Sequence, residues 1–196
     1  MTGLPDRLDR QLDFLVEIDK LKTITRASPI ADGTRKENSG EHSWHLAMFA
    51  LVLADQAEPG VSIDRVIRML LIHDIVEIDA GDTPIHGAGA GSTDQAEAEA
   101  RAADRLFGLL PDDQAAHLRA LWEEFEAAET ADARFAKALD RCQPPLLNMA
   151  SGGGSWTDYA VTLDHIDARV GKPAARGAPV LWQRVRARIL PFFTAD

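Results

Sequence analysis

Residues 69–82, MLLIHDIVEIDAGD, carry the pattern on which the expected fold and the expected site depend. An apolar run over residues 69–72 should be buried, and a histidine and an aspartate follow it directly. In a helix, His73 and Glu77 would lie four positions apart on one face, with Asp74 at its edge. Burying an imidazole and two carboxylates without partners is costly, so the stretch predicts a compensating group such as a divalent cation.

Two other segments supply the same kinds of side chain. The first is Glu41-His42, with His45 one turn later, and the second is Asp140, which follows the largely apolar residues 135–139. Asp140 could therefore face inward and meet the same ion. Imidazole and carboxylate ligands suit a borderline or hard divalent ion, so we expect one ion from Mn²⁺, Co²⁺, Ni²⁺, Zn²⁺ and Mg²⁺.

The remaining histidines fit the site less well. His45 could be a second ligand by its spacing, but packing beside Trp44 is the favoured role. His86 lies in a loop rich in glycine and proline, where it could line a pocket. His117 and His165 are expected to be ordinary surface residues.

Length and composition favour one helical domain. The chain has 196 residues, of which 45% are hydrophobic and 27% charged, an ordinary globular balance. Aromatic residues make up only 6%, and alanine, leucine, arginine and glutamate dominate, which favours helices. We expect an all-α, compact helical bundle over residues 1–196, with a core of about 12–150 and a C-terminal helical extension over 151–196.

The charge excludes several classes of partner. A formal net charge of −10 repels polyanions, so neither a nucleic acid polymer nor an anionic membrane is expected as a partner. The longest strongly apolar stretch, residues 46–54, is far shorter than the roughly 20 residues that cross a bilayer. Cys142 is the only cysteine, which excludes an internal disulfide, and residues 1–10 do not resemble a signal peptide. A cytoplasmic protein is expected.

Helical periodicity, caps and breakers predict the order of the elements. Helices are expected over residues 8–18, 39–57, 62–81, 93–110 and 111–129, then from Thr130 onward, over a short stretch up to residue 170, and over 180–189. Long connections are expected over residues 23–38, 82–91 and 171–179, the last as a flexible link. Pro144 and Pro145 should bend or interrupt the helix that begins at Thr130, because each removes a backbone donor.

The order of the candidate ligands carries a family likeness. His42, then His73-Asp74, then Asp140 on successive helices resembles the HD-domain superfamily of metal-dependent phosphohydrolases. Residues 37–43 are similar to the R-x-E-x-x-x-E/D-H segment of its 5′-deoxynucleotidase branch, and residues 73–82 to that branch's H-D-x-x-E-x-x-x-G-D. Residues 121–126 and 137–141 resemble its W-x-E-[FY] and K-x-[LA]-D segments. The likeness covers roughly residues 12–150.

The resemblance implies a role for each matched position. The metal ligands would be His42, His73, Asp74 and Asp140. Glu77 and Asp82 match the acidic pair that handles water and leaving-group protonation. Arg26 falls near the arginine that grips phosphate, with Arg35 and Lys36 as possible helpers. Some bacterial nucleotidases have a tryptophan next to the sugar where this chain has Ala27, which leaves the choice of sugar open.

The implied activity is removal of the 5′-phosphate from (deoxy)nucleoside monophosphates by a metal-bound water. The implied partners are a small nucleotide substrate and a second copy of the chain in a homodimer. Three alternatives stay open: hydrolysis of a polyphosphorylated nucleotide (an alarmone or a triphosphate), a non-catalytic nucleotide-binding protein that its metal stabilises, and a di-iron enzyme that activates oxygen. The last would need more histidines around the site.

Overall fold

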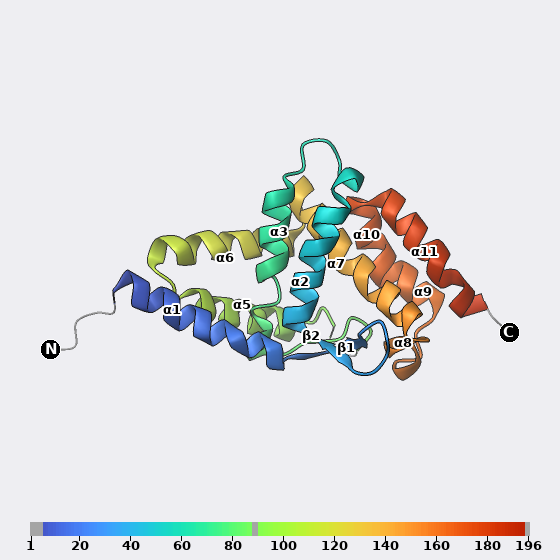
Figure 1. Ribbon diagram of the computed structural model, residues 1–196, viewed down its shortest axis with the longest axis horizontal. Helices are drawn as coiled ribbons and strands as arrows, with labels where there is room; N and C mark the ends of the chain where they lie inside the picture. Colours follow the sequence, from blue (N-terminus) through green and yellow to red (C-terminus); the bar gives the residue numbers. More distant parts are fainter. Residues whose placement is uncertain (1–5, 88–89, 195–196) are drawn as a thin grey trace.

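Helices and one antiparallel hairpin make up the regular structure of the part of the chain that the computed structural model describes, residues 6–87 and 90–194 (Figure 1). The N-terminal elements are α1 (Arg7–Glu17), the 3₁₀ helix η1 (Ile18–Thr23), β1 (Thr25–Pro29), β2 (Lys36–Asn38), α2 (Ser39–Val52), η2 (Ala54–Gln56), α3 (Ile63–Ile72) and α4 (Glu77–Ala80). The remaining elements are α5 (Thr93–Phe107), α6 (Asp112–Ala127), α7 (Ala131–Ala150), α8 (Ser155–Asp158), α9 (Leu163–Ile166), the π-helical turn η3 (Asp167–Gly171), α10 (Lys172–Gly177) and α11 (Pro179–Thr194). The predicted all-α class is confirmed, with a minor hairpin.

The helices begin where side chains satisfy their free backbone donors. Asn38 and Glu41 form a capping box at the start of α2, in which each side chain accepts a hydrogen bond from the other residue's backbone N–H. Ser92 and Thr130 cap α5 and α7 in a similar way, with one side-chain hydrogen bond each. The box places His42 in the first turn of α2, where the helix carries it into the interior.

Residues 23–38 are more ordered than the sequence indicated. They complete η1 and then form the β1–β2 hairpin, with Thr25 opposite Asn38 and Pro29 opposite Lys36. The turn between the strands contains Gly33 at a φ of +71°, a conformation that glycine adopts without strain. The expectation of a plain connection was therefore wrong, because short polar strands leave no apolar alternation in the sequence.

The expected helix over residues 62–81 is broken at the histidine. α3 ends at Ile72, residues 73–76 form a turn, and α4 begins at Glu77. The backbone N–H of Glu77 donates to the carbonyl oxygen of Asp74 at 3.0 Å, a tighter pattern than that of an α-helix. His73 and Glu77 therefore do not share the face of a continuous helix, although both reach the same site.

The C-terminal third differs from the expected arrangement. α7 runs through Pro144 and Pro145 to Ala150, so of the two predicted effects of the prolines, an interruption does not occur. Residues 172–177 form α10 rather than a flexible link, and this helix packs closely against α7. A Cβ added at Gly177 would lie 1.9 Å from the carbonyl oxygen of Arg134, so α10 needs a glycine at this contact.

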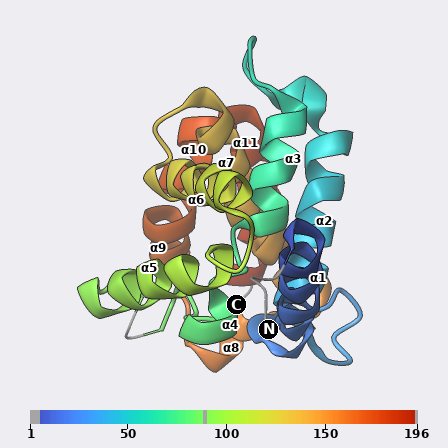
Figure 2. The same cartoon turned by 90° about the vertical axis from the view of Figure 1, so that its left-hand side faces the viewer.

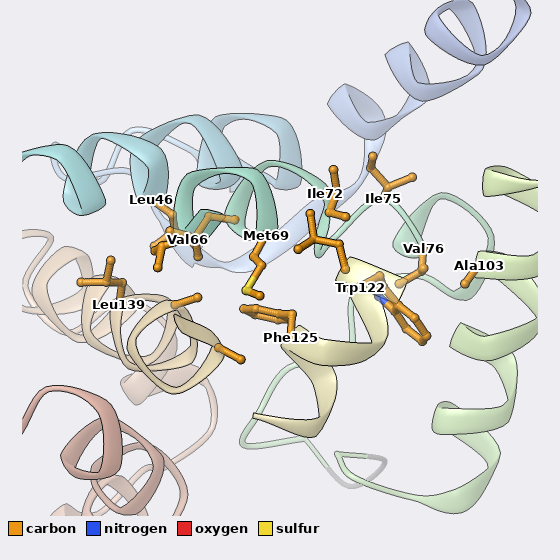
Figure 3. Packing of buried hydrophobic residues seen from close by; sticks show 14 of the residues in the cluster. Leu46, Val66, Met69, Ile72, Ile75, Val76, Ala103, Trp122, Phe125 and Leu139 are labelled. Carbon is orange, nitrogen blue, oxygen red and sulfur yellow. The ribbon is translucent and has the colours of Figure 1, made fainter. Parts of the chain in front are cut away.

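The buried apolar residues form two clusters that share α7. The larger cluster packs α2, α3, α6 and α7 around side chains such as Leu46, Phe125 and Leu139 (Figure 3). The second packs the C-terminal part of α7 against α8–α11 and includes Trp156 and Ile189. Figure 2 shows α2 and α3 on the opposite side of the view from α5 and α9. No helix among the described residues is both long and apolar enough to cross a membrane.

Candidate metal centre

Three side chains from α2, the end of α3 and α7 meet in the interior. His42, His73 and Asp140 are buried, and each offers a ligand atom within 4.8 Å of the other two. His42 Nε2 lies 3.1 Å from Asp140 Oδ1, and His73 Nε2 lies 3.8 Å from the same oxygen. The fold thus joins residues nearly one hundred positions apart into one candidate metal site.

Asp74 completes the set of four predicted ligands. Its Oδ1 lies 2.9 Å from His73 Nε2, and its Oδ2 accepts a hydrogen bond of 2.8 Å from Arg26. One oxygen therefore faces the histidines while the other holds the arginine. The structure brings His42, His73, Asp74 and Asp140 together as the sequence predicted.

The polar atoms of the centre fit a cation. His73 Nδ1 lies 2.9 Å from the carbonyl oxygen of Leu70, which can only accept, so Nδ1 carries the proton. Nε2 lies 2.9 Å from Asp74 Oδ1 and 3.8 Å from Asp140 Oδ1, is buried without a hydrogen-bond partner among the described residues, and is the ring atom that could bind a cation. Acceptors that face acceptors repel one another unless a cation lies between them, and this nitrogen and oxygen donor set suits a divalent ion.

A carboxylate that the prediction did not include stands behind His42. Glu37 is 3% exposed, and its Oε2 lies 3.3 Å from His42 Nδ1. Gln143 Nε2 donates to the other oxygen of Glu37 at 2.8 Å. A carboxylate behind a metal-binding histidine orients the ring and selects its tautomer. Glu37 opens the motif of residues 37–43, which was the available signal.

Charge coupling in the centre shifts several pKa values. Burial and Arg26 lower the pKa of His42, but the adjacent carboxylates of Asp140 and Glu37 outweigh them, so the net pKa is raised. Burial raises the pKa of Asp74, but His73 and Arg26 lower it by more than burial raises it. The net pKa therefore lies well below the ordinary value. The carboxylate stays ionised, as a metal ligand must.

Arg26 lies on β1 inside a cage of carboxylates. Its Nη1 is 2.8 Å from Asp74, 3.8 Å from Glu77 Oε1 and 3.8 Å from Asp82 Oδ1. Its Nε is 3.8 Å from Glu37 Oε2. Burial lowers the pKa of Arg26, but the carboxylates outweigh it and the pKa is raised. This guanidinium is therefore always charged and is already matched by acids of the protein.

The two predicted catalytic acids hold their protons more tightly than free carboxyls. Burial, followed by the charge of Asp74, raises the pKa of Glu77 to about 9, although Ser39 Oγ donates to its Oε2 at 2.6 Å. Burial also raises the pKa of Asp82, while Arg26 opposes that shift. Buried carboxyls with raised pKa values beside a cavity are typical of proton-transfer sites.

A cavity of about 330 Å³ opens from the centre, a size typical of small-molecule sites. Arg26, Ala27, Glu77 and Asp82 line its metal end. One side of α7 runs along it with Lys137, Asp140, Arg141, Pro144 and Asn148, and residues of the C-terminal extension that include Trp156 and Tyr159 form another part of its wall. The C-terminal extension therefore forms part of the same cavity.

Arg35 and Lys36 do not line the cavity. Arg35 donates two hydrogen bonds to the carboxylate of Glu41, at 2.7 and 2.8 Å, on the outer side of the hairpin. Lys36 begins β2 and is exposed. Their positions give no support to the prediction that they bind phosphate. The cations of α7 that do reach the cavity, Lys137 and Arg141, were not predicted as site residues.

The other histidines lie largely as expected. The ring of His45 stacks on Trp44, with centroids 6.1 Å apart, and its Nδ1 lies 3.1 Å from Gln143 Nε2. It packs beside the site and is not part of the cluster of possible ligands. His86 lines the cavity.

Comparison with known proteins found a matching family model, curated relatives and similar solved structures. The HD domain family model matches residues 18–182. The chain is 34% identical over 134 residues to a 5′-deoxynucleotidase of Bos taurus and 32% identical over 134 residues to that of Homo sapiens, covering 67% of this chain. It spans 63% of the length of these curated relatives.

Two solved structures are similar over nearly the whole chain. A predicted metal-dependent phosphohydrolase from Magnetospirillum magnetotacticum MS-1 is 53% identical, with a TM-score of 0.88 over 95% of both chains. A protein from Pyrococcus horikoshii OT3 is 18% identical, with a TM-score of 0.65 over 90% of this chain and 99% of its own. The second likeness shows the fold alone.

Proposed function

This chain belongs to the HD domain family, and from that premise we propose that it removes the 5′-phosphate from deoxynucleoside or nucleoside monophosphates with one divalent ion. The observation that carries the proposal is the joining of His42, His73, Asp74 and Asp140 at one end of a cavity that also holds Arg26 and two proton-binding acids. The relatives named 5′-deoxynucleotidases support the choice of substrate.

The ligands and Arg26 prepare the site for a phosphoryl group. A divalent ion supplies Lewis-acid chemistry, in that it offsets phosphoryl charge and lowers the pKa of water nearby. Glu37 holds the His42 ring, and the Leu70 carbonyl holds the His73 ring, so both Nε2 atoms face the same point. Arg26 presents the remaining donors of its guanidinium to the cavity while Asp74 anchors it.

Glu77 and Asp82 divide the proton transfers between them. Glu77 accepts a proton from the attacking water as the new bond from oxygen to phosphorus forms, and a cation held by the four ligands would lower the pKa of Glu77 toward the working range. Asp82 gives a proton to the departing 5′-oxygen as the P–O bond breaks, a role that burial favours because it raises the pKa of this carboxyl. The products are a nucleoside and orthophosphate.

The experiment is a measurement of phosphate release by the purified protein, loaded in turn with Mn²⁺, Co²⁺ and Mg²⁺. The substrates are the four deoxynucleoside and the four ribonucleoside 5′-monophosphates, and the matching 3′-monophosphates serve as a positional control. We expect release that depends on the metal and is faster for the 5′ series. The ratio between the two sugars shows what Ala27 permits, since it lines the cavity in place of a bulkier ring.

Two results would contradict the proposal. Bound metal without release from any monophosphate would exclude this activity. Pyrophosphate or tripolyphosphate as the product of nucleoside polyphosphates, again with no reaction on monophosphates, would replace it with the polyphosphate reading. Binding without any turnover would leave the protein as a nucleotide-binding protein that its metal stabilises.

The homodimer is part of the same proposal. Exposed apolar side chains on α1, Leu8 at 60%, Leu12 at 51% and Leu15 at 58%, offer one surface for it. Light scattering should then give about twice the chain mass of 21.4 kDa. A mass of one chain at micromolar concentration would exclude a stable dimer.

A further inference from the structure

One side of α7 brings two cations to the cavity, and their surroundings differ. Lys137 and Arg141 lie one helical turn apart on the side that also carries Asp140. Lys137 Nζ is paired with Glu126 at 3.1 Å and lies 4.0 Å from the centroid of the Phe125 ring. Lys137 is therefore already bound within the protein.

Arg141 has no comparable partner among the residues that the structure describes. Its shortest charged contact is from Nε to Asp140 Oδ2 at 3.7 Å, which is longer than a hydrogen bond. Nε is buried and makes no hydrogen bond to any residue that the structure describes. The side chain is 28% exposed and lines the cavity. A guanidinium that is buried in part and lacks an acceptor has donors available for a ligand.

Because the metal end is rich in carboxylates, a negatively charged ligand there needs a cation whose charge the protein does not already offset. Arg26 is matched by Asp74, with Glu77 and Asp82 close by, so its charge is already offset by the protein. A phosphate monoester brings up to two further negative charges into a buried site rich in carboxylates. Of the arginine and lysine side chains that line the cavity, Arg141 is the one whose described contact with an acid is longer than a hydrogen bond, so its donors can still bind such a ligand.

The position of Arg141 is also suitable. Asp140 presents Oδ1 to the two histidines and Oδ2 to Arg141, so the guanidinium borders the metal centre through this ligand. Arg26 borders the centre through the other aspartate, Asp74. Burial raises the pKa of Asp140, and the charge of Arg141 is the first of the influences that bring the net pKa well below its ordinary value.

We propose that Arg141 binds the phosphoryl oxygens of the substrate as a second guanidinium beside Arg26. This assignment rests on the proposed phosphohydrolase activity and gives the cavity the phosphate contact that Arg35 and Lys36 do not provide. The planar fork of arginine can bind two phosphoryl oxygens at once, which a lysine at the same place cannot do.

The test measures binding of inorganic phosphate, the reaction product, to the full-length Mn²⁺-loaded protein by calorimetry. Arg141→Gln should weaken phosphate binding about 10- to 100-fold, because it removes charge-assisted hydrogen bonds. Arg169→Gln is the matched control. Arg169 is an exposed arginine whose hydrogen bond goes to the backbone of Ile85, and its removal should change phosphate affinity by less than about threefold.

Metal content distinguishes an Arg141 that binds phosphate from an Arg141 that only positions the metal ligand Asp140. If Arg141→Gln binds Mn²⁺ more weakly but has wild-type phosphate affinity once saturated with Mn²⁺, Arg141 positions the metal ligand and the proposal is wrong. Arg141→Lys covers the case in which the glutamine variant does not fold. It should lose phosphate affinity about fivefold, since a point charge replaces the fork, and unchanged affinity would overturn the proposal.

The failure of this inference is distinct from failure of the proposed function. Monophosphate hydrolysis with wild-type phosphate affinity in Arg141→Gln would retain the enzyme and remove Arg141 from its substrate contacts. Arg141-dependent phosphate binding in a protein that hydrolyses no monophosphate would support the anion site and reject the 5′-nucleotidase activity.

Discussion

The two ends of the cavity are built from different kinds of contact. At the metal end, buried polar atoms face one another, and His73 Nε2, His42 Nδ1 and Arg26 Nε lack hydrogen-bond partners among the described residues. At the other end, α8–α11 pack apolar side chains such as Trp156 and Ile189 against the C-terminal part of α7. Unsatisfied buried polar groups are costly, whereas buried apolar surface stabilises a fold.

This difference suggests a division of labour along α7. The metal end gives up stability in order to hold an ion and a substrate, and binding of the ion returns part of that stability. The C-terminal wall contributes stability whether or not an ion is bound. Changes at the metal end should therefore alter activity and the response to metal, and changes in the wall should alter stability alone.

The largest effect is expected at Asp74, in the turn after α3, and at Glu77, the first residue of α4. Glu77→Gln should lower turnover about 10²- to 10⁴-fold by removing a proton acceptor, with metal content near that of the wild type. Asp74→Ala should lose the metal itself, because it deletes a ligand and frees Arg26. Elemental analysis and phosphate release, measured on the same samples, separate the two effects. Full activity in Glu77→Gln would remove this residue from the mechanism.

The next effect is stabilisation by metal. Mn²⁺ at one hundred times its dissociation constant should raise the free energy of unfolding by about 2.7 kcal/mol. Urea unfolding with Mn²⁺ and with a chelator measures the difference, and Asp74→Ala should show none of it. Equal stability in both buffers, with Mn²⁺ demonstrably bound in one, would contradict the division of labour.

A change where α10 packs on the N-terminal part of α7 should act independently of metal. Gly177→Ala places a methyl group against the backbone of Arg134 and should destabilise the protein by about 1–3 kcal/mol. Ala175→Ser, at an exposed position of the same helix, is the control and should change stability by less than about 0.5 kcal/mol. The loss should be equal with and without Mn²⁺. A loss of stability that appears only with metal present would show that this contact is coupled to metal binding.

The smallest effect concerns the pH dependence of stability and His86, which lines the cavity. Burial, followed by the charge of Arg169, lowers the pKa of His86 to about 4, against about 6.5 in an unfolded chain. Between these values the unfolded chain binds more protons, so stability falls as the pH drops from 6.5 toward 4. In metal-free buffer, His86→Gln should show a shallower fall than the wild type. Parallel curves of stability against pH for the two proteins would show that a group other than His86 causes the fall.

Local signals predicted much of the fold. Caps at Ser92 and Thr130 and apolar periodicity predicted the helices that now appear as α5, α6 and α7. The hairpin was missed because its strands are short and polar. α10 was missed because close packing of Gly177 on α7, which depends on tertiary contact, overrides a sequence rich in glycine and proline.

The site residues that could be predicted from the sequence are those that lie in short motifs. His42, His73, Asp74 and Asp140 were predicted from residue type and order, and the fold brings them together. Glu37 and Arg141 were not predicted, because the contact of Glu37 with His42 and the place of Arg141 in the cavity lining depend on the tertiary fold. The predicted role of Arg35 and Lys36 in phosphate binding stays a prediction, and Arg35 is bonded to Glu41 outside the cavity.

The most direct test is an anomalous diffraction map from crystals grown with Mn²⁺ and recorded at the manganese edge. The account predicts one strong peak bounded by the Nε2 atoms of His42 and His73, an oxygen of Asp74 and Oδ1 of Asp140. A peak at another site, or none there while solution measurements show one bound equivalent, would contradict the assignment of this cluster as the metal centre.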